Sequence, residues 1–165
     1  MDNDFENLIV TYEKDLYSFC CHLTAGSGVN AGDLYQDTVL AAFEKRAQID
    51  FTRNPKSFLF SIAVGKWKNA WRKAKRRQEK DAMSEDTAES DNPETMVQSS
   101  FTREAIRTAL VALHDKLRIP LILYYFEDRN LDIIASICNI PKGTVKSRLH
   151  KGRALLKAAL EKEGF

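Results

Sequence analysis

Apolar side chains recur at steps of three and four residues along most of the chain, which is the period of an α-helix with one buried face. Turn signals interrupt this repeat at Gly26 and Gly28 and again over residues 50–55. Few segments show the two-residue alternation of a strand. The sequence therefore predicts an all-α protein, with helices over residues 5–24, 31–48, 55–80, 101–113, 118–125 and 131–138 and a last helix after Pro141.

The last of these helices has two faces of different chemistry. Its inward stripe is apolar or small and consists of Val145, Leu149, Gly152 and Leu156. Its outward stripe carries only hydrogen-bond donors and positive charge and consists of Thr144, Ser147, Arg148 and Lys151. Such a face fits a helix in a DNA groove, where Arg and Lys bind phosphates or guanine edges. A solvated basic surface helix would have the same composition.

The segment before this helix favours DNA binding. Residues 131–138 form a short amphipathic pattern, and the turn after them contains Asn139, which tolerates a left-handed backbone. Ile140 would fill the angle between the two helices. A helix, a tight turn and a second helix make up the helix-turn-helix, whose second helix enters the major groove.

Charge is distributed in blocks that the near-neutral total conceals. Residues 1–52 carry three basic and nine acidic side chains, whereas residues 53–80 carry ten basic and one acidic. Residues 81–95 carry six acidic and no basic side chains, and residues 96–165 carry twelve basic and seven acidic. The chain thus has two basic blocks, each next to an acidic one.

The acidic block predicts a boundary between two domains. It contains one large apolar side chain, Met83, too few to offset the entropy lost on ordering. We therefore expect a helical domain over residues 1–78, a flexible acidic linker over residues 79–97 and a second helical domain over residues 98–165. The linker either is a solvated spacer or lies against the basic surfaces when DNA is absent.

The first basic block lies on the helix predicted from Pro55. One stripe of that helix is apolar and the rest of its circumference carries seven Lys and Arg side chains without carboxylates spaced to pair with them. Trp67 and Trp71 lie in the apolar stripe, so they are either core residues or a stacking platform for an unpaired base. The loop before the helix offers Asn54 and Ser57 as hydrogen-bonding groups for a base edge.

Several classes of function are disfavoured by the composition. No run of 18 apolar residues would span a membrane, and the acidic N-terminus differs from a secretory signal, so we expect a cytoplasmic protein. The three cysteines are expected to be buried, reduced thiols, and the three histidines have no common metal-binding spacing. Phosphate-loop and nucleophile motifs are absent. We expect no catalytic residue, metal, cofactor or small-molecule substrate.

Residues 131–156 resemble region 4 of a bacterial sigma factor of the sigma-70 family, extracytoplasmic-function group, most specifically in the run Gly-Thr-Val-Lys-Ser-Arg-Leu-His. The resemblance implies that this helix reads the minus-35 promoter element. The residues that match the reading positions are Lys142, Thr144, Lys146, Ser147, Arg148 and Lys151. Two positions depart from the family pattern: Ile133 replaces a usual glutamate, which weakens the capping of the first helix, and Asn139 replaces a usual glycine.

Residues 58–63, Phe-Leu-Phe-Ser-Ile-Ala, and the basic residues 72–77 resemble region 2 of the same family. The resemblance implies that this helix and the loop before it bind the minus-10 element and hold a base flipped from the non-template strand. Gly65 replaces an asparagine that many relatives carry, which would alter the minus-10 preference. The residues that match the family's contacts are Arg53, Asn54, Lys56, Ser57, Lys66, Asn69, Arg72, Lys73 and Arg76.

Residues 33–43 resemble the region 2.2 helix, which in the family docks on the clamp helices of the polymerase β′ subunit. The residues carried over by the resemblance are Leu34, Gln36, Asp37 and Phe43. Periodicity alone predicts an ordinary amphipathic core helix there.

The combined pattern leaves no room for the additional regions 1.1 and 3 of housekeeping sigma factors. It implies an alternative sigma factor that binds core RNA polymerase through the β′ and β subunits, recognises two promoter elements and promotes DNA opening. The resemblance also implies an anti-sigma partner, commonly membrane-anchored in the family. The rival hypotheses are a helix-turn-helix regulator that acts without polymerase and a nuclease with a carboxylate metal site. The nuclease is disfavoured because the acidic residues cluster away from the basic faces.

Overall fold

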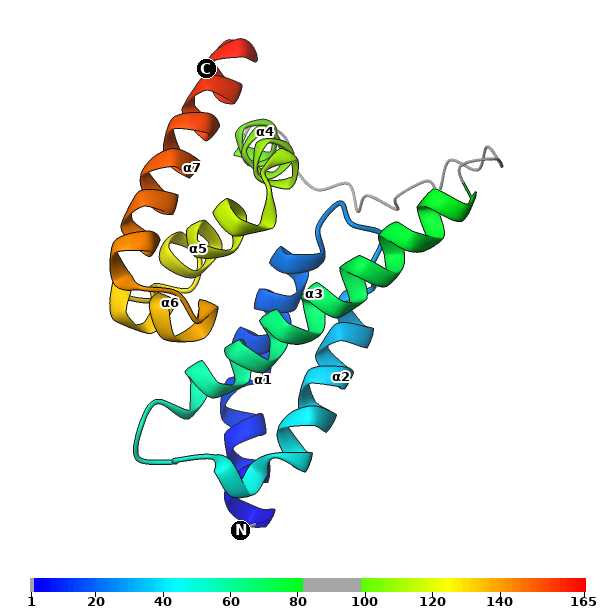
Figure 1. The fold of residues 1–165 in the computed structure, drawn as a ribbon, viewed down its shortest axis with the longest axis vertical. Coiled ribbons are helices and arrows are strands. Elements are labelled where there is room, and N and C mark those ends of the chain that lie inside the picture. Colours follow the sequence, from blue (N-terminus) through cyan, green and yellow to red (C-terminus); the bar gives the residue numbers. More distant parts are fainter. Residues whose placement is uncertain (1, 82–98) are drawn as a thin grey trace.

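Seven α-helices and one short 3-10 turn make up the fold in the computed structural model, which describes residues 2–81 and 99–165 (Figure 1). Within these ranges no strand occurs, so the all-α prediction is confirmed. The elements are α1 (Asp2–Thr24), α2 (Ala31–Glu44), the 3-10 turn η1 (Arg46–Gln48), α3 (Pro55–Asp81), α4 (Ser99–Ala112), α5 (Asp115–Tyr125), α6 (Leu131–Cys138) and α7 (Lys142–Lys162).

The helices α1, α2 and α3 pack against one another as the N-terminal module. The side chain of Asn30 caps α2 by accepting a hydrogen bond from the backbone N–H of Asp33 at 3.0 Å. Pro55 occupies the first position of α3, where its missing N–H costs nothing. The residues of this module that are fully buried include Leu16, Phe19, Leu23, Leu59, Phe60 and Trp67.

The helices α4 to α7 form the C-terminal module, in which α5 packs on α6 and α7. Gly152 allows α7 to approach α5 closely, because a β-carbon at this position would lie 2.8 Å from Cδ1 of Leu121. The resulting core contains Leu121, Leu123, Ile134, Val145 and Leu149, all at most 2% exposed.

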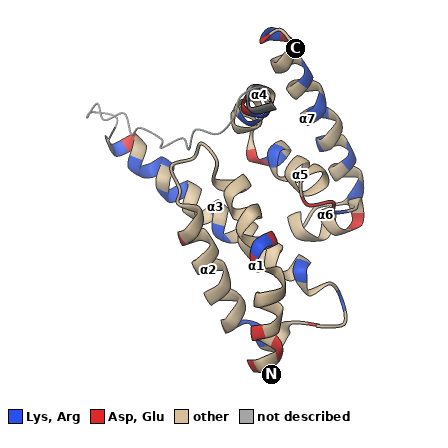
Figure 2. Ribbon diagram, turned by 180° about the vertical axis from the view of Figure 1, so that it is seen from behind, with Lys and Arg blue, Asp and Glu red and all other residues tan. Residues whose placement is uncertain are grey.

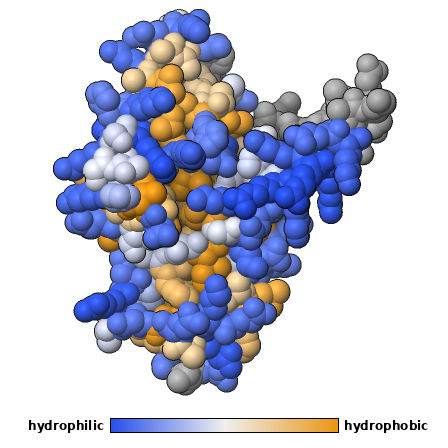
Figure 3. Space-filling model, viewed as in Figure 1, coloured by the Kyte–Doolittle hydropathy of each residue, from blue (hydrophilic) through white to orange (hydrophobic). Residues whose placement is uncertain are grey.

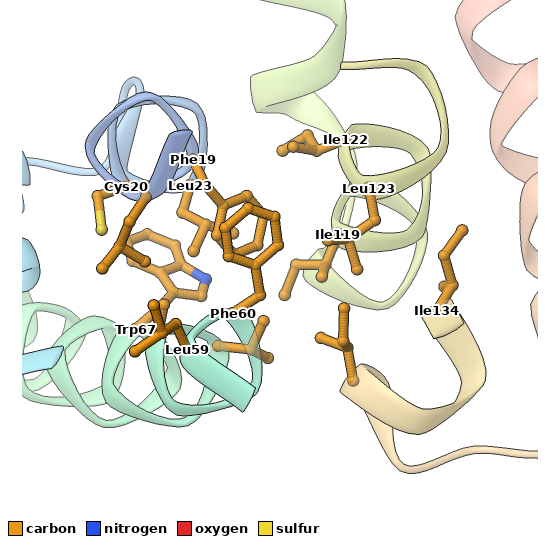
Figure 4. Packing of buried hydrophobic residues seen from close by; sticks show 14 of the residues in the cluster. Phe19, Cys20, Leu23, Leu59, Phe60, Trp67, Ile119, Ile122, Leu123 and Ile134 are labelled. Carbon is orange, nitrogen blue, oxygen red and sulfur yellow. The ribbon is translucent and has the colours of Figure 1, made fainter. Parts of the chain in front are cut away.

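The two modules share one continuous apolar core. Figure 4 shows Phe60 and Phe19 of the N-terminal module facing Ile119 and Ile122 of α5. The helix α6 packs on α3, and α5 packs on α1. The sequence predicted two separate small domains, and it did not predict that they would be in contact.

The predicted linker lies almost wholly outside the described residues. Its first three residues belong to α3, which continues to Asp81, and Ser99 begins α4 just after the predicted end of the linker. Among the described residues, no helix is both long enough and apolar enough to cross a membrane.

Candidate nucleic-acid interface

The helices α6 and α7 meet at the tight turn that the sequence predicted. Asn139 ends α6 in the left-handed conformation, with φ 55° and ψ 51°, and Ile140 is partly buried against the core. Asn130 caps the start of α6, since its side chain accepts a hydrogen bond from the N–H of Ile133 at 2.9 Å. This cap satisfies the N–H of Ile133 at the start of α6.

The exposed face of α7 has the predicted chemistry. Val145 and Leu149 are buried, which turns the opposite stripe toward solvent. Lys146, Ser147 and Lys151 are exposed, whereas Thr144 and Arg148 are partly buried. The Ser147 hydroxyl donates a hydrogen bond to the carbonyl of Thr144 at 3.0 Å. Lys142 is also exposed, and its ammonium lies 3.4 Å from Asp132 on α6.

The basic helix α3 presents its cations on the side away from the core. Figure 2 shows that Lys and Arg dominate the C-terminal half of α3, and Figure 3 shows the same stretch as a strongly hydrophilic arm. The predicted residues that are exposed there are Lys66, Asn69, Arg72, Lys73 and Arg76. No acidic partner is recorded for these cations within the described residues.

The two tryptophans of α3 differ in exposure. Trp67 is fully buried, so it is a core residue and cannot stack on a base in this arrangement. Trp71 is partly buried and stacks on Trp67 with a centroid distance of 5.6 Å. The ammonium of Lys75 lies 5.0 Å from the Trp71 ring, a cation–π contact.

The loop before α3 holds its polar groups in a defined turn. Asp50 accepts a hydrogen bond from the N–H of Thr52 at 2.9 Å, and the Thr52 hydrogen bonds hold the pKa of the Asp50 carboxyl below its usual value. Arg53 and Asn54 are exposed, and Asn54 has a positive φ of 44°. The loop therefore exposes the Asn54 amide and the Arg53 guanidinium to solvent, on a backbone that forms a defined turn.

Two of the predicted minus-10 residues near this loop point their polar groups into the N-terminal module. The Lys56 ammonium lies 2.7 Å from the carboxylate of Asp15, and its side chain is 13% exposed. The Ser57 hydroxyl is buried without a recorded partner. Lys56 thus ties α3 to α1 in this arrangement and is not free to bind a phosphate.

The predicted polymerase-binding residues on α2 include three exposed side chains and one buried side chain. Gln36 and Asp37 are exposed, and Phe43 is 42% exposed. Leu34 is 2% exposed and belongs to the core, so it supports α2 from inside. Leu40, which the sequence analysis did not single out, is 62% exposed on the same helix. The exposed surface of α2 therefore combines apolar side chains, Leu40 and Phe43, with the acidic Asp37.

The structure brings residues of the two predicted DNA surfaces together in one cleft, and places the loop before α3 beside α6 at another. One cleft, of about 300 Å³, lies between α3 and the C-terminal module, and its cations are Lys68, Arg72, Lys75, Lys116 and Arg148. A second cleft, of about 450 Å³, separates the loop containing Arg53 and Asn54 from α6. Residues of α6 that line it include Ile133 and Ser136.

A buried polar cluster at the junction of the modules was not predicted. Arg118 of α5 is 5% exposed and donates hydrogen bonds to the Leu23 carbonyl at 3.2 Å and to Asp115 at 2.9 Å. Nearby, Glu127 lies 4.0 Å from His22. Burial raises the pKa of the Glu127 carboxyl to about 7 and lowers the pKa of His22. Sequence spacing carries no signal for the contacts of Arg118 with Leu23 and of Glu127 with His22, because the two residues of each contact are about 100 positions apart.

An apolar groove of about 580 Å³ runs between α4, α5 and α7. Its floor includes Leu110, Leu121 and Leu156, and Tyr125 and Phe165 lie at its exposed edges. Arg153 donates a hydrogen bond to the Tyr125 hydroxyl at 3.1 Å, which orients the ring. The residues of α7 that line the groove come from its C-terminal half, after the predicted reading positions 142–151.

Two protein families match the chain in the order of its modules. The family described as Sigma-70 region 2 matches residues 8–77, and the family described as Sigma-70, region 4 matches residues 103–156. The two matches include α3 with its basic face and the whole α6–α7 pair. The chain belongs to the sigma-70 family and is an extracytoplasmic-function sigma factor.

Known sigma factors are similar along nearly the full chain. The extracytoplasmic-function sigma factor SigW of Bacillus subtilis is 29% identical over 166 residues, covering 94% of this chain and 88% of that protein. EcfG of Rhodopseudomonas palustris is 29% identical over 157 residues, covering 94% and 84%. The sequence prediction of an extracytoplasmic-function sigma factor is confirmed.

Solved structures agree with this assignment. The sigma factor RpoE of Bartonella quintana, solved with the anti-sigma factor NepR, superposes with a TM-score of 0.80 at 25% identity, over 96% of this chain and 97% of that one. CnrH, solved with the cytosolic domain of CnrY, shares the fold with a TM-score of 0.70 at 18% identity, over 98% of this chain and 90% of that one.

The three cysteines of this sigma factor are free thiols that differ in burial. Cys20 is buried and Cys138 is partly buried, and burial raises their pKa values to about 12 and about 11. Cys21 is exposed, contrary to the expectation that the thiols would be buried. In the ranges 2–81 and 99–165, no group of three potential ligand residues is placed to hold a metal ion.

Proposed function

We propose that this sigma factor binds core RNA polymerase, recognises minus-10 and minus-35 promoter elements and promotes opening of the DNA. The observation that carries the proposal is the presence of region 2 and region 4, in that order, on two modules that each present a cationic helical face. The domains are residues 1–78 and 98–165, with the acidic segment 79–97 as their tether. A regulator that acts without polymerase would need only the second module.

The minus-35 element is read by α7. Arg148 has the side chain best suited to a bidentate contact with guanine, while Thr144 and Ser147 adapt to either donor or acceptor edges. Lys142, Lys146 and Lys151 neutralise flanking phosphates. The apolar support of Val145 and Leu149 favours this role, because it fixes which stripe of α7 faces the groove.

The minus-10 element is held by α3 and the loop before it. Unstacking a base costs a few kcal/mol, least at flexible A·T-rich steps, and a protein lowers this cost only by trapping the separated strand. Asn54 and Arg53 are exposed for base contact, with Ser57 beside them. Phosphates of the strand are bound by Lys66, Arg72, Lys73 and Arg76, with Asn69 as a hydrogen-bonding neighbour. Lys56 joins them only after it leaves Asp15.

Core polymerase is bound at two places. Gln36, Asp37 and Phe43 of α2 contact the β′ clamp helices, and Leu34 holds that helix on the module. The apolar groove beside Tyr125 and Phe165 accepts an apolar segment of the β subunit. Its volume of about 580 Å³ and its lining, which includes none of the proposed reading residues of α7, support simultaneous DNA and polymerase binding.

The protein performs no bond chemistry of its own and acts in the cytoplasm, where bacterial RNA polymerase transcribes. An anti-sigma factor is its regulatory partner. The similarity to a sigma factor solved with NepR supports this partner.

Run-off transcription tests the function directly. Purified protein is added to core polymerase on a library of genomic fragments, and transcript starts are mapped. We expect a set of starts that share two upstream elements and that are absent with core polymerase alone. Specific binding to duplex fragments without polymerase, together with no selective initiation, would favour the regulator instead.

A further inference from the structure

A cavity of about 580 Å³ lies between the C-terminal end of α1 and the helices α4 and α5, and none of the residues proposed to contact DNA lines it. Part of its wall is formed by the ring of His22, which packs on the ring of Phe126 at a centroid distance of 4.5 Å. The apolar residues that line the cavity are Ala25, Ile106, Leu110, Val111, Ile122 and Phe126. Cavities of this size hold small organic molecules.

Three arginines give this cavity a positive charge, and no carboxylate lines it within the described residues. Arg103 and Arg107 are exposed one turn apart on α4, and no ion pair is recorded for either of them in residues 2–81 and 99–165. Like charges at this spacing repel each other. Burial lowers the pKa of His22, and the nearby charge of Arg107 lowers it further. An anion bound at the cavity would relieve this repulsion.

The third arginine is buried in the cavity wall. Arg118 is 5% exposed, and its Nη2 group donates hydrogen bonds to the Leu23 carbonyl and to Asp115. Its Nε–H is also buried, but it has no recorded hydrogen-bond partner in the part of the chain that the structure describes. A buried donor without a partner is costly, because it has lost its hydrogen bond to water. An anionic group that reaches this wall would accept the missing hydrogen bond.

We propose that this cavity is a binding site for an alkyl oxyanion, a short aliphatic chain that ends in a carboxylate or a phosphate monoester. The chain lies along the aliphatic wall, and the arginines bind the head group. The ligand is held without being altered, so the site adds no enzymatic activity. Because α1 belongs to the N-terminal module and α4 and α5 belong to the C-terminal module, the bound ligand contacts both modules.

The charge of the lining selects among apolar ligands. An alcohol of the same chain length lacks the charge that the arginines attract, and an amine is repelled by them. The groove between α4, α5 and α7 is also apolar, but its lining includes the carboxylate of Glu161 besides Arg153 and Lys157. An alkyl anion is therefore expected to prefer the cavity beside α1.

The exposed thiol of Cys21 reports occupancy, because it lines the cavity. N-Ethylmaleimide is added to the full-length protein, and the rate of alkylation is followed by intact-protein mass spectrometry. Burial raises the pKa of Cys20 to about 12 and that of Cys138 to about 11, so both react slowly, and Cys21→Ser measures their background. Rates are measured at constant ionic strength with octanoate, octyl phosphate, octanol or octylamine, each relative to the same protein without ligand.

We expect octanoate or octyl phosphate to slow alkylation of Cys21 at least about fivefold once its concentration exceeds the Kd several times, and their half-protecting concentrations rank the two head groups. Octanol and octylamine should protect less than about twofold at the same concentrations. Arg107→Gln should raise the half-protecting concentration about tenfold, through the loss of a charge-assisted contact. The matched control is Lys14→Gln, which removes one exposed charge from α1 outside the cavity and should leave that concentration unchanged.

Three outcomes would overturn the site: no protection by either anion, equal protection by octanol, or equal effects of Arg107→Gln and Lys14→Gln. Alkylation requires neither polymerase nor promoter DNA, so these outcomes leave the proposed sigma function to its own test by run-off transcription.

Discussion

Individual side chains on α7 are suited to different parts of the proposed promoter recognition. Arg148 is partly buried and carries a planar guanidinium. Lys151, one turn later, is exposed and serves as a point charge. A rigid, forked donor reads a base edge, whereas a flexible ammonium mainly neutralises phosphate.

Arg148→Ala should therefore weaken discrimination at one minus-35 base. We expect a loss of about 1–3 kcal/mol on the preferred sequence and a much smaller loss on a template altered at that base. Competitive run-off transcription on matched and altered templates measures the difference. Lys151→Ala is the control, for which we expect similar losses on both templates. A uniform loss for Arg148→Ala would mean that Arg148 binds only phosphate.

The proposed role of Asn54 lies in DNA opening more than in closed-complex formation. Its amide is exposed at the end of a turn that its own backbone conformation shapes. We expect Asn54→Ala to lower open-complex formation by about 1–2 kcal/mol, the order of one hydrogen bond, while binding to duplex promoter changes less. Permanganate reactivity of unpaired thymines reports opening. Unchanged reactivity would contradict the role, and Asn54→Asp, which keeps the turn but not the amide donor, controls for backbone effects.

Glu127 makes stability depend on pH. Because its pKa is raised to about 7 in the folded protein, chiefly by burial, the folded state holds a proton that the unfolded state has already released. Its contribution is fully present below pH 4.5 and is lost as pH rises through about 7. The groups around the carboxyl are His22, Lys56, Asp15, Arg129 and Asp128.

We predict that the wild type loses about 1–3 kcal/mol more stability than Glu127→Gln between pH 5 and pH 8. Urea denaturation of both proteins at a series of pH values measures this difference. Burial also lowers the pKa of His22, and His22 is present in both proteins. Identical pH profiles would mean that Glu127 is solvated.

At the level of elements, the sequence was a good guide. Amphipathic periodicity located all seven helices, and α6 has the predicted bounds. The turn at Asn139 followed from local backbone chemistry alone. It was harder to predict which side chains of a helix are buried or paired inside the protein, because their partners are distant in sequence. Lys56 pairs with Asp15, 41 residues earlier, and Leu34 is 2% exposed whereas Phe43, later on the same helix, is 42% exposed.

Two glycines within helices test how packing overrides helix propensity. Gly152 faces Leu121 at 2.8 Å from its β-carbon position, whereas Gly65 has nothing within 4 Å. Alanine gains about 1 kcal/mol over glycine in a helix, but overpacking costs about 1–3 kcal/mol. We expect Gly65→Ala to stabilise by up to about 1 kcal/mol and Gly152→Ala to destabilise by about 1–2 kcal/mol in urea denaturation. Equal gains would mean that α5 and α7 are not in close contact.

The arrangement of the whole molecule could not be predicted from the sequence. The apolar stripes of α3 and α5 indicate that each helix is buried, but they do not identify the partner module. Each module is small and has a modest core, so a shared apolar junction adds stability that neither has alone. The same junction borders the surfaces that we propose for promoter binding.

Salt should shift the balance between closed and open molecules. The cleft between the modules gathers five cations, and its one carboxylate, Asp115, is already paired with Arg118. Repulsion across this cleft opposes closure and is screened when the Debye length falls from about 10 Å at 0.1 M to about 3 Å at 1 M salt. We therefore predict that the radius of gyration measured by small-angle X-ray scattering decreases as salt rises. Lys116→Gln should be more compact than the wild type at low salt, whereas Lys162→Gln, at the far end of α7, should not. Expansion with salt would instead mean that attraction between the acidic residues 81–95 and the basic surfaces controls closure.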